Sequence, residues 1–238
     1  LNETIRTVIV NLAGLRRSDV EPFDLGYWLR NEPTDSLPCR PDIIATQNRT
    51  RATVTPELFA RLNAGRLWWN YQGHANEFVL AHENFYRNVG GEDDREFLTN
   101  DGKPFLFSAF SCHANAFARY GDLAGGRGPS LGEEMVTLPG RGAVASWASS
   151  GYEILPFSSV SHINVAWARA MFESPPHDPY LGQPGARAVL GETIALALLR
   201  YVPTVTFNPN EKGIALTYHL LGDPATQLSI GEPQAIVT

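Results

Sequence analysis

The chain has no cluster of lysine and arginine and no long apolar run, and both absences limit its partners. Its 238 residues carry 19 basic and 25 acidic side chains, a formal net charge of −6. A nucleic-acid surface needs concentrated positive charge, so we expect no nucleic-acid partner. No stretch approaches the roughly 20 apolar residues of a membrane-spanning helix, so we expect no membrane span. The first residues, Leu1–Thr4, do not resemble a signal peptide.

Cysteine is scarce as well, with Cys39 and Cys112 the two examples. Cys39 lies in a proline-rich turn, Leu37–Pro41, whereas Cys112 ends an apolar run. A disulfide requires a specific geometry that nothing in these two contexts indicates, so we predict two free thiols. The low count does not decide the compartment, because a secreted enzyme with a thiol nucleophile would also have few cysteines.

Internal repeats and low-complexity tracts are also absent. With 43% hydrophobic and 18% charged residues, the chain can bury one sizeable core. We therefore expect residues 1–238 to form a single domain.

Two apolar runs each end on a reactive side chain. Leu67–Gly73 leads to His74, and Pro104–Ser111 leads to Cys112. Both runs are typical of buried strands, and in open α/β sheets catalytic groups collect where such strands end. A histidine and a cysteine arriving there from separate strands indicate a Cys-His dyad, in which imidazole takes the thiol proton and leaves a thiolate nucleophile.

Strand and helix patterns alternate along the rest of the chain. Alternation of this kind predicts a three-layer α/β/α sandwich with a mainly parallel sheet. The stretch after the first strand, up to Pro41, is rich in turn residues, and its apolar residues show neither helical nor strand periodicity, so we predict a loop there. The further predicted elements are a strand at Thr4–Leu12, a helix at Thr55–Leu62 with Thr55 as N-cap, a helix at Ser130–Leu138, a strand at Gly142–Ala148, helices at Ser161–Phe172 and Ala186–Tyr201, and a closing segment at Ala215–Leu221.

Five short motifs follow one another along the chain: Asn70–His74, Phe110–Cys112, Ser130–Glu134, Gly142–Ser146 and Leu220–Ala225. In this order they resemble the gingipain-type cysteine peptidases, which have a caspase-like fold. The resemblance covers about Arg51 to Leu228, positions 51–228. It implies that the chain is the catalytic half of a larger precursor, with protein or peptide substrates and with a missing N-terminal portion or pro-segment of the same precursor as a partner.

The resemblance implies a cysteine endopeptidase that acts through an acyl-enzyme. His74 would be the general base toward Cys112 and then the acid toward the leaving amine. The oxyanion of the tetrahedral intermediate would bind the main-chain N–H groups of Cys112 and of Ala75, which stands where the family typically has glycine. A positive φ at Ala75 would be strained, whereas a negative φ would preserve the donor.

An acid upstream of the histidine often orients it in this family. Asp19, Glu21 and Asp24 follow the first predicted strand and are the candidates.

Three residues are candidates for the substrate pocket. Trp147 stands where a tryptophan lines the pocket in some relatives. Gln72 and Phe110 lie two positions before His74 and Cys112, so the alternation of a strand points them to the same face. No acid can be assigned to the pocket floor, so the residue preferred at the cleaved bond stays open.

Two other functional classes share this pattern. A sortase-like transpeptidase would use the same fold and dyad but resolve the acyl-enzyme with an amine, and a structural or regulatory relative would have lost activity. A caspase proper is disfavoured, because the Gln-Ala-Cys-x-Gly signature is absent and the interval from His74 to Cys112 is 38 positions, shorter than the roughly 50 expected.

No metal or other cofactor is predicted. A zinc site built from His74, His82, Cys112 and His113 lacks the spacing of dedicated zinc sites, and we expect His82 and His113 to be loop or packing residues, His113 on an extended backbone. The acidic loop Glu92–Glu96 could hold a structural calcium ion, but a solvated charge run is favoured. Family resemblance alone implies secretion or attachment to the cell envelope.

Overall fold

The computed structural model describes residues 6–10, 20–24, 48, 50–89, 92–119, 128–153, 163–172, 187–205 and 209–229. For residues 6–10 and 20–24 the backbone alone is described. The structure is built on a six-stranded sheet with the order β10-β8-β7-β3-β1-β2. Asp19 and Cys39 lie outside the described residues.

The centre of the sheet is parallel. β3 pairs in parallel with β7, and β7 with β8, while the outer pairings of β10, β1 and β2 are antiparallel. Parallel strands at the centre leave their carboxyl ends at one shared edge. The strands are β1 (Arg6–Val10), β2 (Val20–Asp24), β3 (Trp68–Gln72), β7 (Phe105–Phe110), β8 (Ala143–Ser149) and β10 (Tyr218–Leu221).

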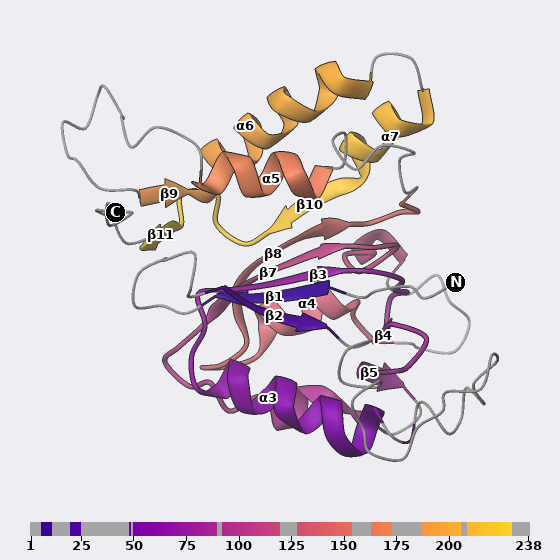
Figure 1. The fold of residues 1–238 in the computed structure, drawn as a ribbon, viewed down its shortest axis with the longest axis vertical. Helices are drawn as coiled ribbons and strands as arrows, with labels where there is room; N and C mark the ends of the chain where they lie inside the picture. The colour runs from indigo at the N-terminus through magenta and orange to yellow at the C-terminus, as the bar shows by residue number, and fades with distance from the viewer. Residues whose placement is uncertain are drawn as a thin grey trace, which may run out of the picture.

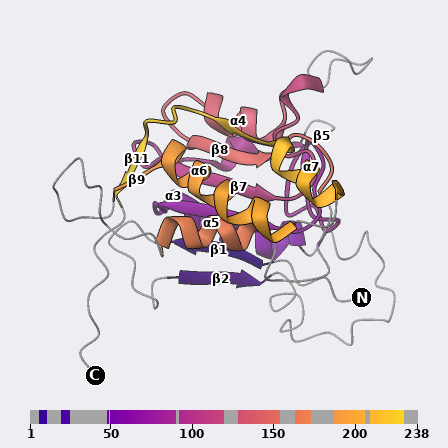
Figure 2. The same cartoon turned by 90° about the horizontal axis from the view of Figure 1, so that it is seen from above.

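Helices cover both faces of this sheet, as Figures 1 and 2 show. On one face lie α3 (Thr55–Asn63) and α4 (Leu131–Thr137). On the other lie α5 (Ile163–Phe172), α6 (Leu190–Tyr201) and α7 (Pro209–Thr217). The predicted α/β/α sandwich is confirmed. None of the described helices is long and apolar enough to cross a membrane.

Side chains of the central strands alternate between the two helical layers. In β3, Trp69 and Tyr71 join the core under α3, whereas Trp68 joins the core under α5. β7 is buried at all six positions, because it lies in the middle of the sheet with helices on both sides. The continuous apolar pattern of both runs is therefore the pattern of strands buried on two faces.

The remaining elements are short. β4 (Val79–Leu80), β5 (Tyr86–Val89) and β6 (Glu92–Asp93) form a small sheet after β3, and β9 (Arg187–Val189) pairs with β11 (Gln227–Ser229). Helical turns lie at η2 (Thr50–Val54), η3 (Asp94–Phe97), η4 (Phe117–Arg119) and η6 (Val202–Val205).

Several predicted elements differ from those observed. The segment expected to be loop up to Pro41 contains the edge strand β2, in which Pro22 pairs with Val8 of β1. An edge strand tolerates proline because one side of it needs no ladder hydrogen bonds. The predicted helix from Ala186 begins instead at Leu190, after β9, and the closing segment from Ala215 divides into the end of α7 and β10.

Thr55 is not the N-cap of its helix. The chain is already helical in η2, so the residue before α3, Val54, has helical φ and ψ. The Thr55 hydroxyl donates instead to the carbonyl of Phe85 at 2.8 Å. A turn preceding β5 thereby becomes tied to the start of α3.

Candidate active site

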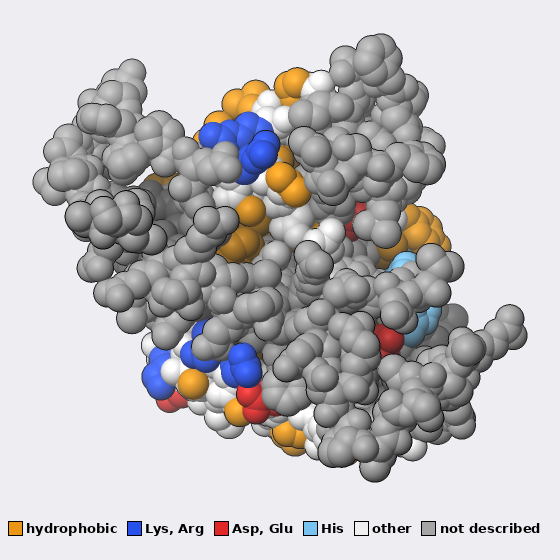
Figure 3. Space-filling view, viewed as in Figure 1, with side chains coloured by type: hydrophobic (Ala, Val, Ile, Leu, Met, Phe, Trp, Pro, Cys, Tyr) orange, Lys and Arg blue, Asp and Glu red, His pale blue; other side chains and the backbone are white. Residues whose placement is uncertain are grey.

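The register of β3 and β7 brings the two candidate catalytic residues to one level. Gln72 pairs with Phe110, and the N–H of Gly73 donates to the Phe110 carbonyl at 3.3 Å. His74 and Cys112 each follow two positions after this pair, on strands that lie about 4.8 Å apart. His74 is exposed and Cys112 is half-buried. Figure 3 shows histidine side chains gathered at the side of the molecule toward which β3 and β7 point.

The main chain of His74 is held from two directions. Its carbonyl accepts from the Tyr71 hydroxyl at 2.6 Å and from the Ala81 N–H at 2.8 Å. Tyr71 is fully buried on the α3 side of the sheet, so its hydroxyl ties the loop that carries His74 to the core. The imidazole is left at the surface while its backbone is fixed.

Ala75 has a negative φ, because the described non-glycine residues with positive φ are Ala81, Asn84 and His113. It forms an isolated antiparallel bridge with Leu80. That bridge uses the N–H of Asn76 and the carbonyl of His74, and it leaves the N–H of Ala75 out of the pairing. The alanine therefore keeps the donor that the expected oxyanion site requires. Its role in binding an oxyanion stays a prediction.

Cys112 begins a tight turn rather than an extended segment. His113 has φ of 58°, in the left-handed region where histidine is among the enriched residues. This corrects the expectation of an extended backbone at His113. The His113 side chain is buried, 8% exposed, and packs against Tyr152 with ring centroids 4.4 Å apart. The prediction that His113 is a packing residue is therefore confirmed.

The first turn of α4 joins the histidine loop to the cysteine turn. The N–H of Leu131 donates to the carbonyl of Glu77, and the N–H of Gly132 donates to the carbonyl of Ala114, each at 2.9 Å. These donors lack partners within a helix, so the two loops satisfy them. The sequence predicted a helix at Ser130–Leu138, and the structure adds a capping box at its start, in which the Glu133 carboxylate accepts from the Ser130 N–H and hydroxyl. The sequence did not show that this helix end connects the two loops.

The three candidate pocket residues lie on the α5 face of the sheet. Trp147 and Phe110 are buried, at 0% and 1% exposed, with their rings 5.6 Å apart. Trp147 also lies against Trp167 of α5, with ring centroids 4.2 Å apart. These two side chains form the core beneath the candidate site, and their part in binding a substrate stays a prediction.

Gln72 is half-buried and bonded to α5. Its Oε1 accepts from Asn164 Nδ2 at 3.0 Å, and Asn164 Oδ1 accepts in turn from Asn70 Nδ2 at 3.3 Å. The chain of polar contacts continues through Asn70 Oδ1, which accepts from the Ser108 hydroxyl at 2.8 Å. These contacts fix the orientation of the Gln72 amide beside the strand end. Its role as a pocket wall is untested.

Two of the candidates for the histidine-orienting acid, Glu21 and Asp24, lie on β2. Asp24 pairs with Arg6 of β1, and Glu21 pairs with Ile9, nearer the middle of that strand. Since β1 lies between β2 and β3, the backbone at Asp24 is two strand spacings, roughly 10 Å, from β3. Register places Asp24 nearer than Glu21 to the edge that carries His74. The assignment of an acid remains a prediction.

The other histidine candidate, His82, lies in the turn between β4 and β5, with its ring centroid 5.2 Å from that of His74. The prediction that it is a loop residue is confirmed. Within the described ranges no group of three or more His, Cys, Asp or Glu side chains is arranged to hold a metal ion. The zinc alternative therefore gains no support.

The acidic loop has partners within the protein. Asp94 is fully buried and forms an ion pair with Arg51, and it also accepts from the N–H of Arg87 at 2.8 Å. Asp93 pairs with Arg95. A calcium ion at this loop, which stays a prediction, would have to displace these cations. The solvated charge run that the sequence favoured does not describe Asp94.

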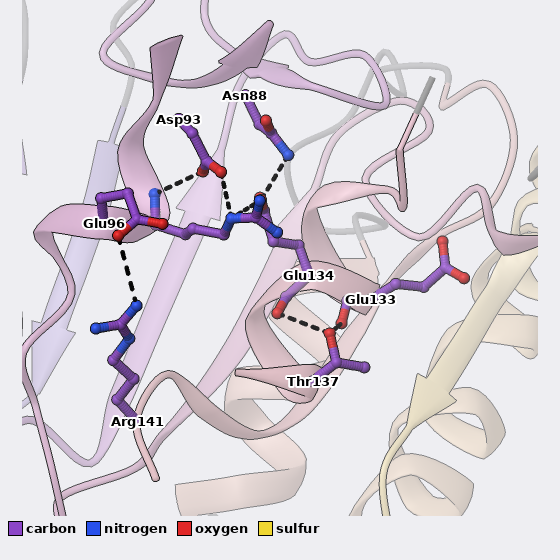
Figure 4. Close-up of polar contacts among 8 residues, drawn as sticks. Asn88, Asp93, Glu96, Glu133, Glu134, Thr137 and Arg141 are labelled. Atoms are coloured by element: carbon purple, nitrogen blue, oxygen red, sulfur yellow. Dashed lines mark hydrogen bonds and ion pairs between the residues drawn. The ribbon is translucent and has the colours of Figure 1, made fainter. Parts of the chain in front are cut away.

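A buried carboxyl group, Glu134 on α4, lies beside this loop, and Figure 4 shows its contacts. Its Oε1 accepts from Asn88 Nδ2 and lies 3.4 Å from Arg95 Nε. Burial, followed by the nearby charge of Asp93, raises the pKa of Glu134 to about 8, and Arg95 opposes the shift. Burial and the charge of Glu134 also raise the pKa of Tyr86. The raised pKa favours the protonated form of Glu134 at neutral pH.

This shift predicts a pH-dependent stability. Between pH 4.5 and about 8 the folded chain keeps the Glu134 proton that the unfolded chain releases, so the stabilisation is complete below pH 4.5 and is lost as pH rises to about 8. Glu134→Gln mimics the protonated form and removes this dependence. We expect the free energy of unfolding of the wild type, measured in urea, to fall between pH 5 and pH 8 by a few kcal/mol more than that of the variant, at about 1.4 kcal/mol per pKa unit. An equal pH dependence in both proteins would contradict the assignment.

Comparison with known proteins adds to this geometry. Residues 38–229 match the model of peptidase family C25. The chain superposes on the Arg-specific cysteine proteinase gingipain R (RGPB) with a TM-score of 0.53 and 17% identity, over 73% of this chain and 36% of that one. On a complex of the pro- and mature domains of RgpB from Porphyromonas gingivalis, the TM-score is 0.55 at 19% identity, over 79% of this chain and 42% of that one. No curated protein sequence matches the chain significantly.

The superpositions show a shared fold, and the chain spans about two fifths of the length of those structures. They confirm the caspase-like α/β sandwich that the sequence predicted. The family match, over residues 38–229, covers the ends of β3 and β7 and also α4. This chain therefore belongs to peptidase family C25, the family of the gingipain-type cysteine peptidases.

Proposed function

We propose that the protein is a cysteine endopeptidase in which His74 activates Cys112. The observation that carries the proposal is the pairing of Gln72 with Phe110 on two adjacent parallel strands. His74 and Cys112 each follow two positions after this pair. Membership of a peptidase family makes peptide bonds the expected substrate. An exposed imidazole and a half-buried thiol that follow the ends of two adjacent strands support this chemistry.

The reaction proceeds in two steps. His74 accepts the Cys112 proton, and the thiolate attacks the peptide carbonyl while the main-chain N–H groups of Cys112 and Ala75 bind the oxyanion. His74 then protonates the leaving amine as the carbon–nitrogen bond breaks. A water molecule, deprotonated by His74, hydrolyses the thioester and regenerates the thiol. We include in this proposal protein or peptide substrates and an action outside the cytoplasm, the latter on family membership alone.

Alkylation tests the nucleophile. We expect iodoacetamide at pH 6 to label Cys112 much faster than Cys39, as found by mass spectrometry of the labelled peptides. Labelling should abolish cleavage of a mixed peptide library in proportion to the Cys112 modified. Cys39→Ser is the matched control and should retain cleavage, whereas Cys112→Ala should have none.

Two outcomes would redirect the proposal. If Cys112 reacts no faster than Cys39 and no peptide is cleaved, the chain is an inactive relative in this form. If added glycinamide is incorporated into the products in place of water, the enzyme is a transpeptidase of the same fold. A library cleaved only at hydrolysed bonds supports the peptidase.

A further inference from the structure

A main-chain donor beyond the expected dyad lies against the Cys112 sulfur. The N–H of Glu153 donates to Cys112 Sγ at 3.3 Å, and the carbonyl of Glu153 lies 3.7 Å from the same sulfur. The carbonyl can accept from a protonated thiol, whereas the N–H can donate to a thiolate. Because the N–H is the nearer group and hydrogen bonds to charged acceptors are the stronger class, this residue's main chain favours the thiolate on balance.

The loop that carries this donor is fixed to the cysteine turn. The N–H of His113 donates to the carbonyl of Gly151 at 2.8 Å, and the N–H of Asn115 donates to the carbonyl of Ser149 at 2.9 Å. The Ser149 hydroxyl also accepts from the N–H of Gly151 at 3.1 Å. The loop after β8 is thus tied to the turn at two points before it reaches Glu153.

One aromatic contact lies directly before the donor. Tyr152 is 74% exposed, yet its ring stands edge to face on the buried ring of His113, with centroids 4.4 Å apart. Neither ring nitrogen of His113 has a hydrogen-bond partner among the described residues, so this ring acts through packing. The N–H that reaches the sulfur belongs to the peptide group between Tyr152 and Glu153. Holding the Tyr152 ring therefore restricts the movement of the Tyr152 backbone, to which that peptide group is attached.

We propose that Tyr152 is a positioning residue for the nucleophile: its ring, held on His113, orients the next peptide group so that the N–H of Glu153 stabilises the Cys112 thiolate. The inference rests on the proposed function, since it takes Cys112 as the nucleophile. The thiol proton passes to His74, and the N–H of Glu153 keeps its own proton.

Two charged side chains are expected to affect the thiolate in opposite directions. His74, once protonated, attracts the thiolate from the end of β3. The Glu153 carboxylate repels it, and this carboxylate also faces Tyr218 of β10. Burial and the Glu153 charge raise the pKa of Tyr218, so its phenol is neutral beside the site. The donor and the carboxylate of Glu153 can therefore be separated by substitution.

The test is the alkylation rate of Cys112 in the full chain from pH 5 to pH 9. We expect Tyr152→Ala to slow labelling at pH 6 about 5-fold, the scale of one hydrogen bond, and to change it less than about 2-fold at pH 9, where thiolate forms without help. Tyr152→Phe keeps the ring and should restore the wild-type profile. Glu153→Gln keeps the N–H but removes the charge, so it should label faster than wild type at pH 6.

A second variant, His113→Asn, removes the other ring and suits the left-handed backbone; it should reproduce the Tyr152→Ala profile. The inference is overturned if Tyr152→Ala or His113→Asn matches wild type at pH 6, or if the rates fall equally at both pH values. Failure of the proposed function has a different signature. Peptides would then stay uncleaved, while Cys112 labelling would still depend on Tyr152.

Discussion

Replacing His74 with alanine is expected to reduce kcat/KM for peptide cleavage by about 1,000-fold, within the range of 10²–10⁴ that general acid–base catalysis contributes. His74 would serve twice, first as base toward Cys112 and then as acid toward the leaving amine, so its loss affects both halves of acylation. The measurement is steady-state hydrolysis of the best substrate from the peptide library, with the wild type assayed at the same pH.

The fold should survive this substitution. The His74 imidazole is exposed, and the bonds from Tyr71 and Ala81 that fix the loop go to the His74 carbonyl, which alanine retains. The thermal midpoint should therefore stay within about 2 °C of wild type, because surface substitutions usually change stability by no more than about 0.5 kcal/mol.

His82 offers a matched control for this experiment. It is also exposed, lies with its ring centroid 5.2 Å from that of His74, and comes from the neighbouring turn. We expect His82→Ala to keep kcat/KM within about 3-fold of wild type, since no step of the proposed mechanism uses it. If His82→Ala lost as much activity as His74→Ala, or if His74→Ala remained active, the dyad would be wrong.

The central strands were predictable from sequence because they are buried on both faces. A continuous run such as Phe105–Phe110 has no polar face, and few structures other than a central strand or a buried helix accept it. The edge strand β2 was not predictable. Its sequence, Val20–Asp24, includes a proline and two acids, which are depleted in strands, so nothing in the segment itself indicates its pairing with β1.

Tertiary contacts also changed several local predictions. The residues Arg187–Val189 fit a helix by pattern, but they pair with Gln227–Ser229, which lie beyond α6, α7 and β10 in the sequence. Thr55 has the sequence of an N-cap, but the preceding turn is already helical and its hydroxyl serves Phe85. Local propensity is a weak prior in such cases, because contacts from distant residues decide the outcome.

The candidate site was predictable in its two reactive residues and not in its supporting contacts. His74 and Cys112 follow from strand ends that a sequence can reveal. The donors from Leu131 and Glu153 come from main-chain groups, which leave no residue-type signal. Sequence patterns therefore indicate which side chains react, while the groups that hold them require the structure.

Gly132→Ala is expected to destabilise the protein by about 3 kcal/mol or more, the upper range for overpacking a tight core. A Cβ at this position would overlap Oδ1 of Asn115 and would lie 2.5 Å from the Ser146 hydroxyl oxygen. Both atoms are engaged: the Ser146 hydroxyl donates to Asn115 Oδ1 at 2.8 Å, and Asn115 Nδ2 donates to the His219 carbonyl at 3.0 Å. The added methyl group has to break this buried bond or displace α4.

Either response disturbs the candidate site, because the N–H of Gly132 also holds the carbonyl of Ala114 in the cysteine turn. We expect the thermal midpoint to fall by roughly 6 to 12 °C, at about 2 to 4 °C per kcal/mol for a chain of this size. Cys112 alkylation at pH 6 should slow in the fraction that remains folded, measured at a temperature well below the new midpoint.

Gly213→Ala is the matched control for this substitution. Gly213 lies within α7, and a Cβ there would meet nothing within 4 Å. Alanine in a helix is favoured over glycine by about 0.8–1.0 kcal/mol, so this variant should be slightly more stable than wild type and unchanged in Cys112 reactivity. A Gly132→Ala protein as stable as Gly213→Ala would mean that α4 can move away from Asn115 freely. The first turn of α4 would then not fix the relative position of the His74 loop and the Cys112 turn, and the reactivity of Cys112 would have to depend on the two strands alone.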